Sequence, residues 1–251
     1  MDFNHILNQT DHRAFPLPLG PWIGTQRWNH LLYAHWPVPV TVLREKIPSC
    51  LEIDTYDNHA WIGVIPFYLN EFRPRYLPPF PFAHAFPELN VRTYVKYKGI
   101  SGIYFFSLDA GSHLAVKGAR SFFHLPYRYA KMNIEVADER VHYLSRRQEI
   151  EGTKADFLAH YKPVSAPFYS NKESLDYWLT ERYRFYTEHT NKLYFLDIHH
   201  QPWALQQTEA EIQVNSVVSA SSGIELPNTQ PVLHYSKTQK VLFWPLRQID
   251  L

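Results

Sequence analysis

The chain has 251 residues, and its 25 lysines and arginines nearly balance 24 aspartates and glutamates, which leaves a net charge of +1. This balance excludes the strongly basic surface that nucleic-acid binders need, so we expect no nucleic-acid partner. A single cysteine, Cys50, excludes an internal disulfide framework. Because neither a signal peptide nor an apolar run of about 20 residues is recognisable, we expect a cytoplasmic protein without a membrane partner, folded as one domain over residues 1–251.

The first half of the chain carries mainly strand patterns behind an irregular start. Residues 1–20 show little periodicity, and we expect an N-terminal arm laid over the domain. Proline is tolerated in a first helical turn, so Pro39 predicts the start of a short helix at 40–46, which Pro48 ends. Runs rich in β-branched and aromatic residues predict the strands of this half, at 25–35, 59–69, 90–97 and 102–108.

One segment between these strands is dominated by proline. Residues 73–87 contain five prolines, a density that excludes regular structure and predicts a stiff loop. Two interpretations of this loop stay open. It covers a cavity, or it lies on the surface packed by its own aromatic rings.

The second half mixes helices with further strands. Helical patterns occupy 115–123 and 153–160, and a longer helix is predicted from Ser170 to about residue 186, because Ser170 and Glu173 have the spacing of a capping box. Four residues of that segment share one helical face: Leu175, Trp178, Leu179 and Arg182. The predicted strands lie at 127–136, 141–147, 193–199, 209–218 and 232–244. The fold class expected from this order is α+β, mostly antiparallel β.

Aromatic residues are unusually frequent. Phenylalanine, tryptophan and tyrosine make up 16% of the chain, which has only 9 glycines. Large rings suit pleated sheet surfaces and enclosed apolar cavities. Two interpretations stay open, a β core filled with rings and an interior in which some rings line a ligand cavity.

The common catalytic and cofactor motifs are missing from the sequence. None of the fourteen histidines has metal-chelating spacing, and the adjacent pair His199 and His200 would point to opposite faces of a strand. Neither the nucleophile elbow of hydrolases nor a glycine-rich nucleotide cradle is found. We therefore expect no metal and no cofactor.

One polar face remains as a candidate site. On an extended chain Glu88, Asn90, Arg92 and Tyr94 project to the same side. Such a face is either a structural ion pair or, if it turns inward, an acid/base or anion-holding site, because buried charges must be paired or hydrogen-bonded.

A second candidate segment follows the helix predicted at 115–123. If residues 127–136 form one strand, Tyr127, Tyr129 and Lys131 share one face and Arg128 lies on the other. Both segments belong to the stretches on which a family resemblance rests.

The sequence resembles the YqjF-like family of uncharacterised bacterial proteins, a domain of unknown function in the acetoacetate decarboxylase-like superfamily. The similar segments include 30–67, 85–95, 102–110 and 118–132, the last of which reads GARSFFHLPYRYAKM. The resemblance implies an antiparallel β-barrel or cone with a few peripheral helices and a largely apolar interior cavity. It also implies that the protein is able to assemble as a homo-oligomer, as superfamily relatives often do.

Enzymes of that superfamily form a Schiff base between a lysine and a keto acid. Where they have two adjacent lysines, this chain has Tyr127 and Arg128, and neither side chain can form that adduct. Glu88 falls where the decarboxylase has an active-site glutamate. Asn29 falls near an active-site arginine, with Arg27 as the alternative if the alignment shifts. Two lysines, Lys117 and Lys131, remain as candidate Schiff-base formers.

We therefore expect a cavity protein that binds a small organic acid or carbonyl compound. Arg92 or Arg128 would hold a carboxylate, Tyr127 would donate a hydrogen bond, and Glu88 would orient the ligand. Three further residues complete the expected ligand-binding set: Asn29, Asn90 and Lys131. Two alternatives stay open: a lyase or isomerase that uses Glu88 and Tyr127 as an acid/base pair, and a non-catalytic structural or interaction protein.

Overall fold

The computed structural model describes residues 3–79, 84–148 and 153–250, which form fourteen strands and five helices. The strands are β1 (Gly24–Val38), β2 (Glu52–Ile53), β3 (Ala60–Pro74), β4 (Phe86–Tyr97), β5 (Ile100–Ala110), β6 (Tyr127–Tyr129), β7 (Lys131–Ala137), β8 (Arg140–Arg147), β9 (Ala155–Pro163), β10 (Arg184–His189), β11 (Lys192–His199), β12 (Gln206–Asn215), β13 (Val232–Phe243) and β14 (Arg247–Ile249). The helices are α1 (Asn4–Leu7), α2 (Val40–Arg44), α3 (His113–Phe123), α4 (Leu175–Thr180) and α5 (Val217–Ser222). None of these described helices is long and apolar enough to span a membrane.

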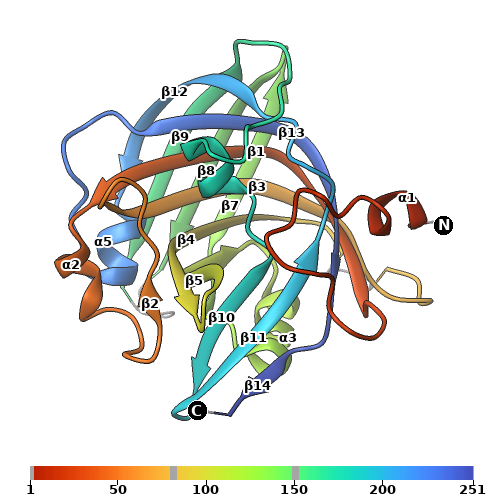
Figure 1. Ribbon diagram of the computed structural model, residues 1–251. Coiled ribbons are helices and arrows are strands. Elements are labelled where there is room, and N and C mark those ends of the chain that lie inside the picture. Colours follow the sequence, from red (N-terminus) through yellow and green to blue (C-terminus); the bar gives the residue numbers. More distant parts are fainter. Residues whose placement is uncertain (1–2, 80–83, 149–152, 251) are drawn as a thin grey trace.

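Seven strands close into a ring around the interior. In the order β11, β10, β5, β4, β3, β1 and β13 each strand pairs with the next, and β13 pairs again with β11 through Phe243 and Ile198. All of these pairings are antiparallel except that of β10 with β5. The ring is cone-like (Figure 1), so the expected α+β, mostly antiparallel fold class is confirmed.

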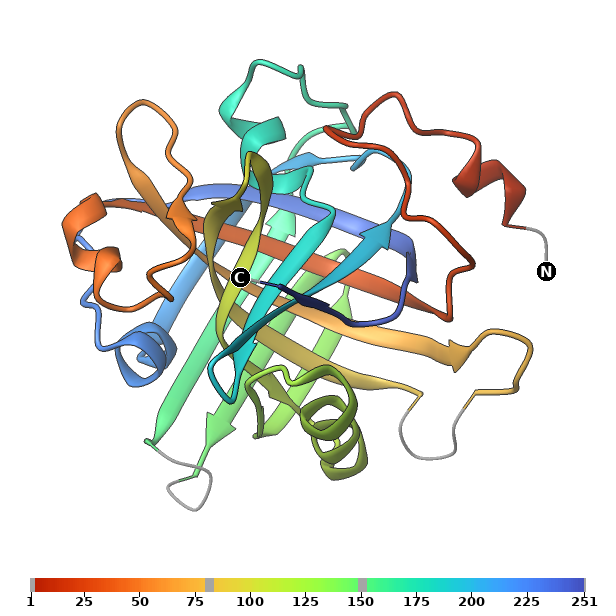
Figure 2. The ribbon, with the colours of Figure 1, turned by 60° about the horizontal axis from the view of Figure 1, so that its bottom comes forward.

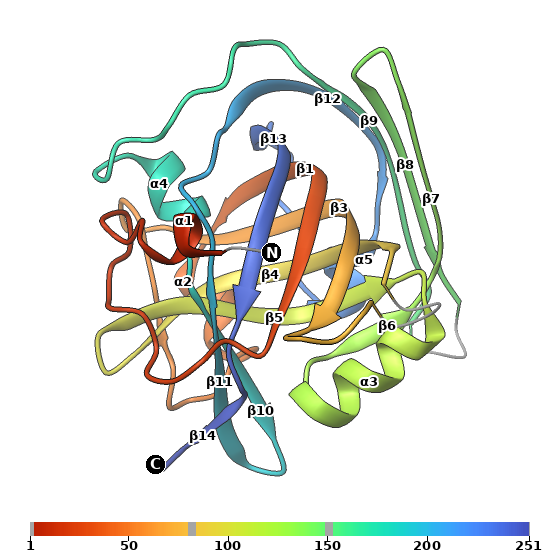
Figure 3. The ribbon, with the colours of Figure 1, turned by 90° about the vertical axis from the view of Figure 1, so that its right-hand side faces the viewer.

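A second layer covers the outer face of part of this ring. The sheet continues from β13 through β12, β9, β8 and β7, and these strands fold back beside β1, β3 and β4 (Figure 3). Val64 and Val91 of the ring pack there against Tyr143 and Phe157 in one apolar cluster. Because side chains alternate along a strand, the neighbours of Val91 in β4 face the interior of the ring.

The predicted helix at 153–160 is wrong, because this segment is strand β9. Its residues alternate between buried and more exposed positions, with Ala155, Phe157, Ala159 and Tyr161 buried. This period of two fits a strand whose one face packs on the ring. The helical pattern was a coincidence of a short apolar run.

The predicted helix from Ser170 to residue 186 is mostly wrong, since only α4 is helical. Its N-cap is Ser174, whose hydroxyl accepts from the backbone N–H of Tyr177, and not Ser170. The chain leaves the helix at Glu181 because Glu181 and Arg182 bury their side chains in other polar contacts. From residue 184 the chain forms β10.

Two other predicted segments are revised in part. The expected strand at 127–136 is interrupted at Ala130, so that β6 pairs with β5 in the ring whereas β7 pairs with β8 in the outer layer. The expected loop at 73–87 is shorter, because β3 continues to Pro74 and β4 begins at Phe86. Residues 80–83 of that loop lie outside the described part of the chain.

Candidate functional site

The ring encloses a cavity of about 760 Å³. Its wall is made largely of aromatic and aliphatic side chains, among them Trp28, Phe67 and Phe105. The interior is therefore hollow, and the interpretation in which some aromatic rings line a cavity is the one that the structure supports. Glu88, Asn90 and Arg92 reach this cavity from alternate positions of β4.

Arg92 is a buried cation whose contacts are with neutral groups. Its Nη2 donates to the Tyr94 hydroxyl and to the Leu179 carbonyl oxygen, both at 3.2 Å. Its Nε has no hydrogen-bond partner among the described residues, and none of the ion pairs found there includes this guanidinium. Burial of a charge without a counter-charge is costly, which makes this guanidinium a candidate anion-binding group.

Neighbouring groups hold Arg92 in place. The Tyr94 hydroxyl donates its only proton to the Leu179 carbonyl oxygen at 2.9 Å. It must therefore accept the hydrogen bond that joins it to Nε2 of His35 at 2.6 Å. Burial lowers the pKa of His35 well below its ordinary value, and the ring is therefore neutral. Gly63 of β3 is paired with Arg92 of β4. A Cβ atom on Gly63 would lie 2.9 Å from the His35 ring, so the glycine leaves room for that ring. The neutral anchors leave the positive charge of Arg92 uncompensated.

A second guanidinium makes this end of the cavity electropositive. Arg182 also lines the cavity and donates from Nη1 to Asp54 Oδ2 at 2.6 Å, while Lys96 lies 2.7 Å from the other oxygen of Asp54. Burial lowers the pKa of Arg182, whereas Asp54 raises it. Asp54 is thus shared by Arg182 and Lys96, and Arg92 belongs to no ion pair among the described residues, so positive charge is in excess at this end of the cavity.

Glu88 and Tyr127 form the second polar point of the cavity. The Tyr127 hydroxyl donates to Glu88 Oε2 at 2.8 Å. Burial raises the pKa of Glu88 to about 8, and the hydrogen bond from Tyr127 only partly offsets this. Burial also raises the pKa of Tyr127 well above its ordinary value. Near neutral pH both groups are protonated, so the Glu88 carboxyl is able to donate a hydrogen bond to a ligand.

The raised pKa of Glu88 predicts how stability depends on pH. The unfolded carboxyl titrates near 4.5 and the folded one near 8, so the folded state binds more protons between these values and stability falls as pH rises through them. Relative to Glu88→Gln, the free energy of unfolding of the wild type should decrease by about 1.4 kcal/mol per pH unit between roughly pH 5.5 and 7.5. Urea unfolding at several pH values measures this difference.

The matched control for that titration is Glu209→Gln, which removes a carboxylate from the surface, where the side chain is 69% exposed. Its stability should run parallel to that of the wild type over the same pH range. Parallel curves for Glu88→Gln and the wild type would show instead that Glu88 titrates normally in the folded protein.

Sequence reasoning overlooked several polar residues of the cavity wall. They are Gln26, Tyr33, Thr180, Arg182 and His200. Arg182 carried a signal, because it shared the apolar face of a predicted helix, where a charge is expected only if it is paired. His200 was considered only as a metal ligand. Burial lowers its pKa well below the ordinary value, so it lines the cavity as a neutral ring.

Four residues named from the sequence lie outside the cavity wall. Arg128 and Lys131 are exposed, since Arg128 lies on the far face of β6 and Lys131 begins β7 in the outer layer. Lys117 is exposed on α3. Asn29 instead donates to the Tyr68 carbonyl oxygen and to Asn70. The structure thus brings together Glu88, Asn90, Arg92 and Tyr127 and leaves these four apart.

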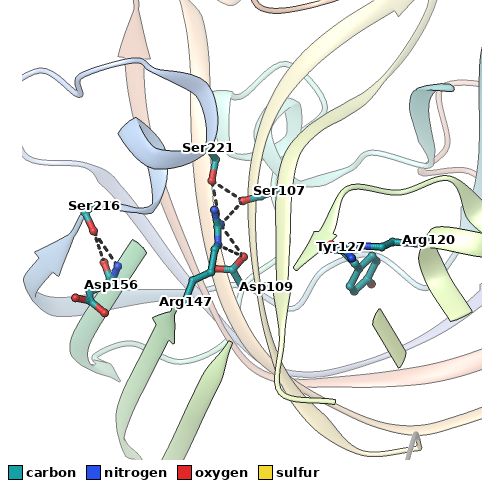
Figure 4. A network of polar contacts seen from close by, with 8 residues as sticks. All are labelled: Ser107, Asp109, Arg120, Tyr127, Arg147, Asp156, Ser216 and Ser221. Atoms are coloured by element: carbon teal, nitrogen blue, oxygen red, sulfur yellow. Dashed lines mark hydrogen bonds and ion pairs between the residues drawn. The ribbon is translucent and has the colours of Figure 1, made fainter. Parts of the chain in front are cut away.

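Figure 4 shows the polar contacts next to the cavity. Arg120 of α3 donates from Nε to the Tyr127 carbonyl oxygen at 2.7 Å and so fixes the strand that presents Tyr127. On the other face of β5, Arg147 donates to Asp109 at 2.6 Å and to Ser107 and Ser221 at 3.1 Å. This second network joins β5, β8 and α5, and it supports the wall from outside.

Two sequence comparisons found relatives of this chain. The sequence model of DUF2071, described as an uncharacterized conserved protein, matches residues 25–240. The uncharacterized protein YqjF of Bacillus subtilis (strain 168) is 59% identical over 232 residues, which are 92% of this chain and 95% of YqjF.

Solved structures with the same fold are acetoacetate decarboxylase-like. One acetoacetate decarboxylase superposes with a TM-score of 0.64 at 12% identity, covering 99% of this chain and 98% of its own. The acetoacetate decarboxylase of Legionella pneumophila gives 0.59 at 14% identity, covering 98% and 95%. The enduracididine biosynthesis enzyme MppR, in complex with pyruvate, gives 0.60 at 8% identity, covering 94% and 93%. At these identities the likeness concerns the fold alone, and it agrees with the cone-like fold that the resemblance implied.

Proposed function

This chain belongs to the DUF2071 family of uncharacterized conserved proteins, and we propose that it binds a small organic acid in the cavity of the ring, with Arg92 as the carboxylate-binding residue. The observation that carries this proposal is the buried guanidinium of Arg92, whose Nε has no partner among the described residues. A carboxylate would accept charge-assisted hydrogen bonds from this guanidinium and neutralise its positive charge.

Glu88 and Tyr127 supply a second recognition point in this proposal. Glu88 lies four residues from Arg92 along β4, which is about 13 Å between Cα atoms, and Tyr127 reaches Glu88 from β6. A protonated Glu88 would donate to a carbonyl or hydroxyl oxygen of the ligand, and Asn90, whose Oδ1 is buried without a partner in the described structure, lies between the two points. MppR, described in complex with pyruvate, supports the idea that this fold accommodates an oxygenated acid.

A second candidate function is acid/base catalysis at the same point. The pKa of Glu88, raised to about 8, is close to the pH at which a general acid or base works best. Tyr127 is in direct hydrogen bond with it at 2.8 Å. No lysine belongs to the cavity wall within the described residues, so the chemistry favoured here is enolisation or lyase chemistry by Glu88 and not a Schiff-base reaction.

A ligand screen followed by thermal unfolding tests the binding proposal. Keto, hydroxy and simple carboxylic acids are compared with their primary amides, which keep the shape but lose the charge. A ligand present at a hundredfold excess over its dissociation constant stabilises the folded state by about 2.7 kcal/mol. Stabilisation by one class of acids but not by its amides is expected. Equal effects of acids and amides would contradict a carboxylate site.

Exchange of the hydrogens next to a ligand carbonyl group in deuterated water tests the catalytic candidate. With a keto acid that binds, wild-type protein should accelerate this exchange if Glu88 acts as a base. Glu88→Gln should lose the acceleration but retain binding through Arg92. Binding without any acceleration in the wild type would leave the protein as a binder and reject the catalytic candidate.

A further inference from the structure

The polar groups of the cavity are concentrated towards one end of its wall. Along β4 the lining residues follow in the order Arg92, Asn90, Glu88 and Phe86. Arg92 and Phe86 are six residues apart, which corresponds to about 20 Å of strand. The wall therefore changes from charged to apolar over this distance.

Beyond Phe86 the wall stays apolar almost to its outer edge. Phe86 pairs with Leu69 of β3, and Leu69 pairs with Trp28 of β1. Four residues further along β1, Gly24 pairs with Phe243, which also lines the cavity. The same region of the wall includes Ile23, Phe72, Pro74, Leu246 and one polar residue, Gln26.

Helix α3 runs along this apolar half of the cavity. At the start of the helix, Ala115 packs in the same apolar cluster as Phe86. At its end, the rings of Phe123 and Phe243 pack edge to face, with their centroids 6.0 Å apart. In Figures 1, 2 and 3 α3 lies beside the strands β10 and β11 of the ring. Leu114 and Phe122 line the cavity although they are 56% and 76% exposed, so this helix borders the mouth.

The cavity is larger than a short acid requires. A volume of about 760 Å³ corresponds to roughly 25 water-sized groups at about 30 Å³ each, whereas a short keto acid has roughly six or seven non-hydrogen atoms. Such an acid at Arg92 would leave the apolar half of the wall without contacts. Extending this ligand past Phe86 would remove both its own and the protein's apolar surface from water.

Building on the proposed function, we infer that the acid bound here carries an elongated apolar tail. Its carboxylate lies at Arg92, its middle passes Glu88 and Tyr127, and its tail extends along α3 towards the mouth. The class of ligand is thus a medium- or long-chain carboxylic acid, with or without an oxygen function along the chain, or an acid with an aryl-alkyl tail.

Gly118 of α3 offers a way to block the tail without touching the charged end. It lines the cavity and lies one helical turn from both Leu114 and Phe122. A Cβ atom built on Gly118 meets nothing within 4 Å, so a side chain is tolerated there. Gly118→Trp would fill the mouth, and Gly118→Ala is the matched control.

Calorimetric titration of straight-chain acids from butanoate to hexadecanoate, the longest of which matches the distance from Arg92 to Phe86, tests this inference. For the wild type the dissociation constant is expected to fall by about threefold to fourfold per added methylene group. Gly118→Trp should weaken the binding of hexadecanoate by tenfold or more and change the binding of butanoate by less than about twofold. Gly118→Ala should bind both acids as the wild type does, and Arg92→Leu should weaken both.

The outcomes separate this inference from the proposed function. If affinity depends on Arg92 but is the same for butanoate and hexadecanoate, the acid site stands and the tail is rejected. If hexadecanoate binds Gly118→Trp as it binds the wild type, the tail does not run along α3 and the inference is wrong. If no acid of any length binds, the proposed function itself fails.

Discussion

Arg92→Leu is expected to abolish the stabilisation of the protein by carboxylic acids without lowering its own stability. Loss of the guanidinium should weaken carboxylate binding by about 2 kcal/mol or more, which is roughly thirtyfold. In the absence of ligand the variant should unfold at an equal or higher temperature, because a buried cation without a counter-charge is replaced by an apolar side chain. Thermal unfolding with and without acid measures both effects.

This combination distinguishes a ligand-binding residue from a structural one, because a structural arginine would destabilise the fold when removed. The matched control is Arg128→Leu, which removes the same charge from the exposed face of β6, outside the cavity wall. Its acid binding should equal that of the wild type. If Arg128→Leu is no longer stabilised by carboxylic acids whereas Arg92→Leu still is, the anion site lies on the exposed face of β6, outside the cavity.

Asp109→Ala is expected to cause the largest loss of stability among single substitutions in the polar networks. The variant leaves Arg147 buried without its counter-charge, and breaking a buried ion pair in this way costs about 3–5 kcal/mol. Both side chains are almost fully buried, at 3% and 0% exposure, so solvent cannot compensate. Urea unfolding monitored by the fluorescence of the tryptophans measures the change.

The double variant Asp109→Ala/Arg147→Met should recover much of this loss, because the unpaired cation is gone while Ser107 and Ser221 retain their mutual hydrogen bond at 2.7 Å. At the surface, Glu209→Ala removes one partner of the exposed pair with Lys162 and should change stability by less than about 1 kcal/mol. If Asp109→Ala and Glu209→Ala lose the same free energy of unfolding, the Asp109 network does not stabilise the wall of the cavity.

The alternation of residues along β4 was readable from the sequence and predicted the polar wall of the cavity. Val91 faces the outer apolar cluster, and Glu88, Asn90 and Arg92 face the interior, as the strand period of two requires. The choice between a surface ion pair and an inward site could not be made from the strand alone. It depends on the second layer that covers the Val91 face.

The positions of the cationic candidates were harder to predict, because they depend on where a strand ends. A continuous strand at 127–136 would place Tyr127 and Lys131 on one face, but the interruption at Ala130 sends Lys131 into the outer layer. The helix predicted from Ser170 to residue 186 contains α4 but is too long for a related reason. Glu181 and Arg182 form long-range contacts with Trp203 and Asp54, which sequence spacing does not reveal.

The length of the cavity and its mouth at α3 could not be predicted at all. They follow from the closure of the ring between β11 and β13, a pairing of two short strand ends. The resemblance to acetoacetate decarboxylase-like proteins did predict the cone-like ring, and the structural comparisons confirm it.

The most direct test of the central claim is a calorimetric comparison of one carboxylic acid with its own primary amide on the wild-type protein at pH 7. The two ligands share the same tail, so the difference in affinity reports only the contacts of the carboxylate. If Arg92 receives that carboxylate, the acid should bind at least about tenfold more tightly, a difference of about 1.4 kcal/mol. Equal binding of the two, or tighter binding of the amide, would contradict an anion site in this cavity.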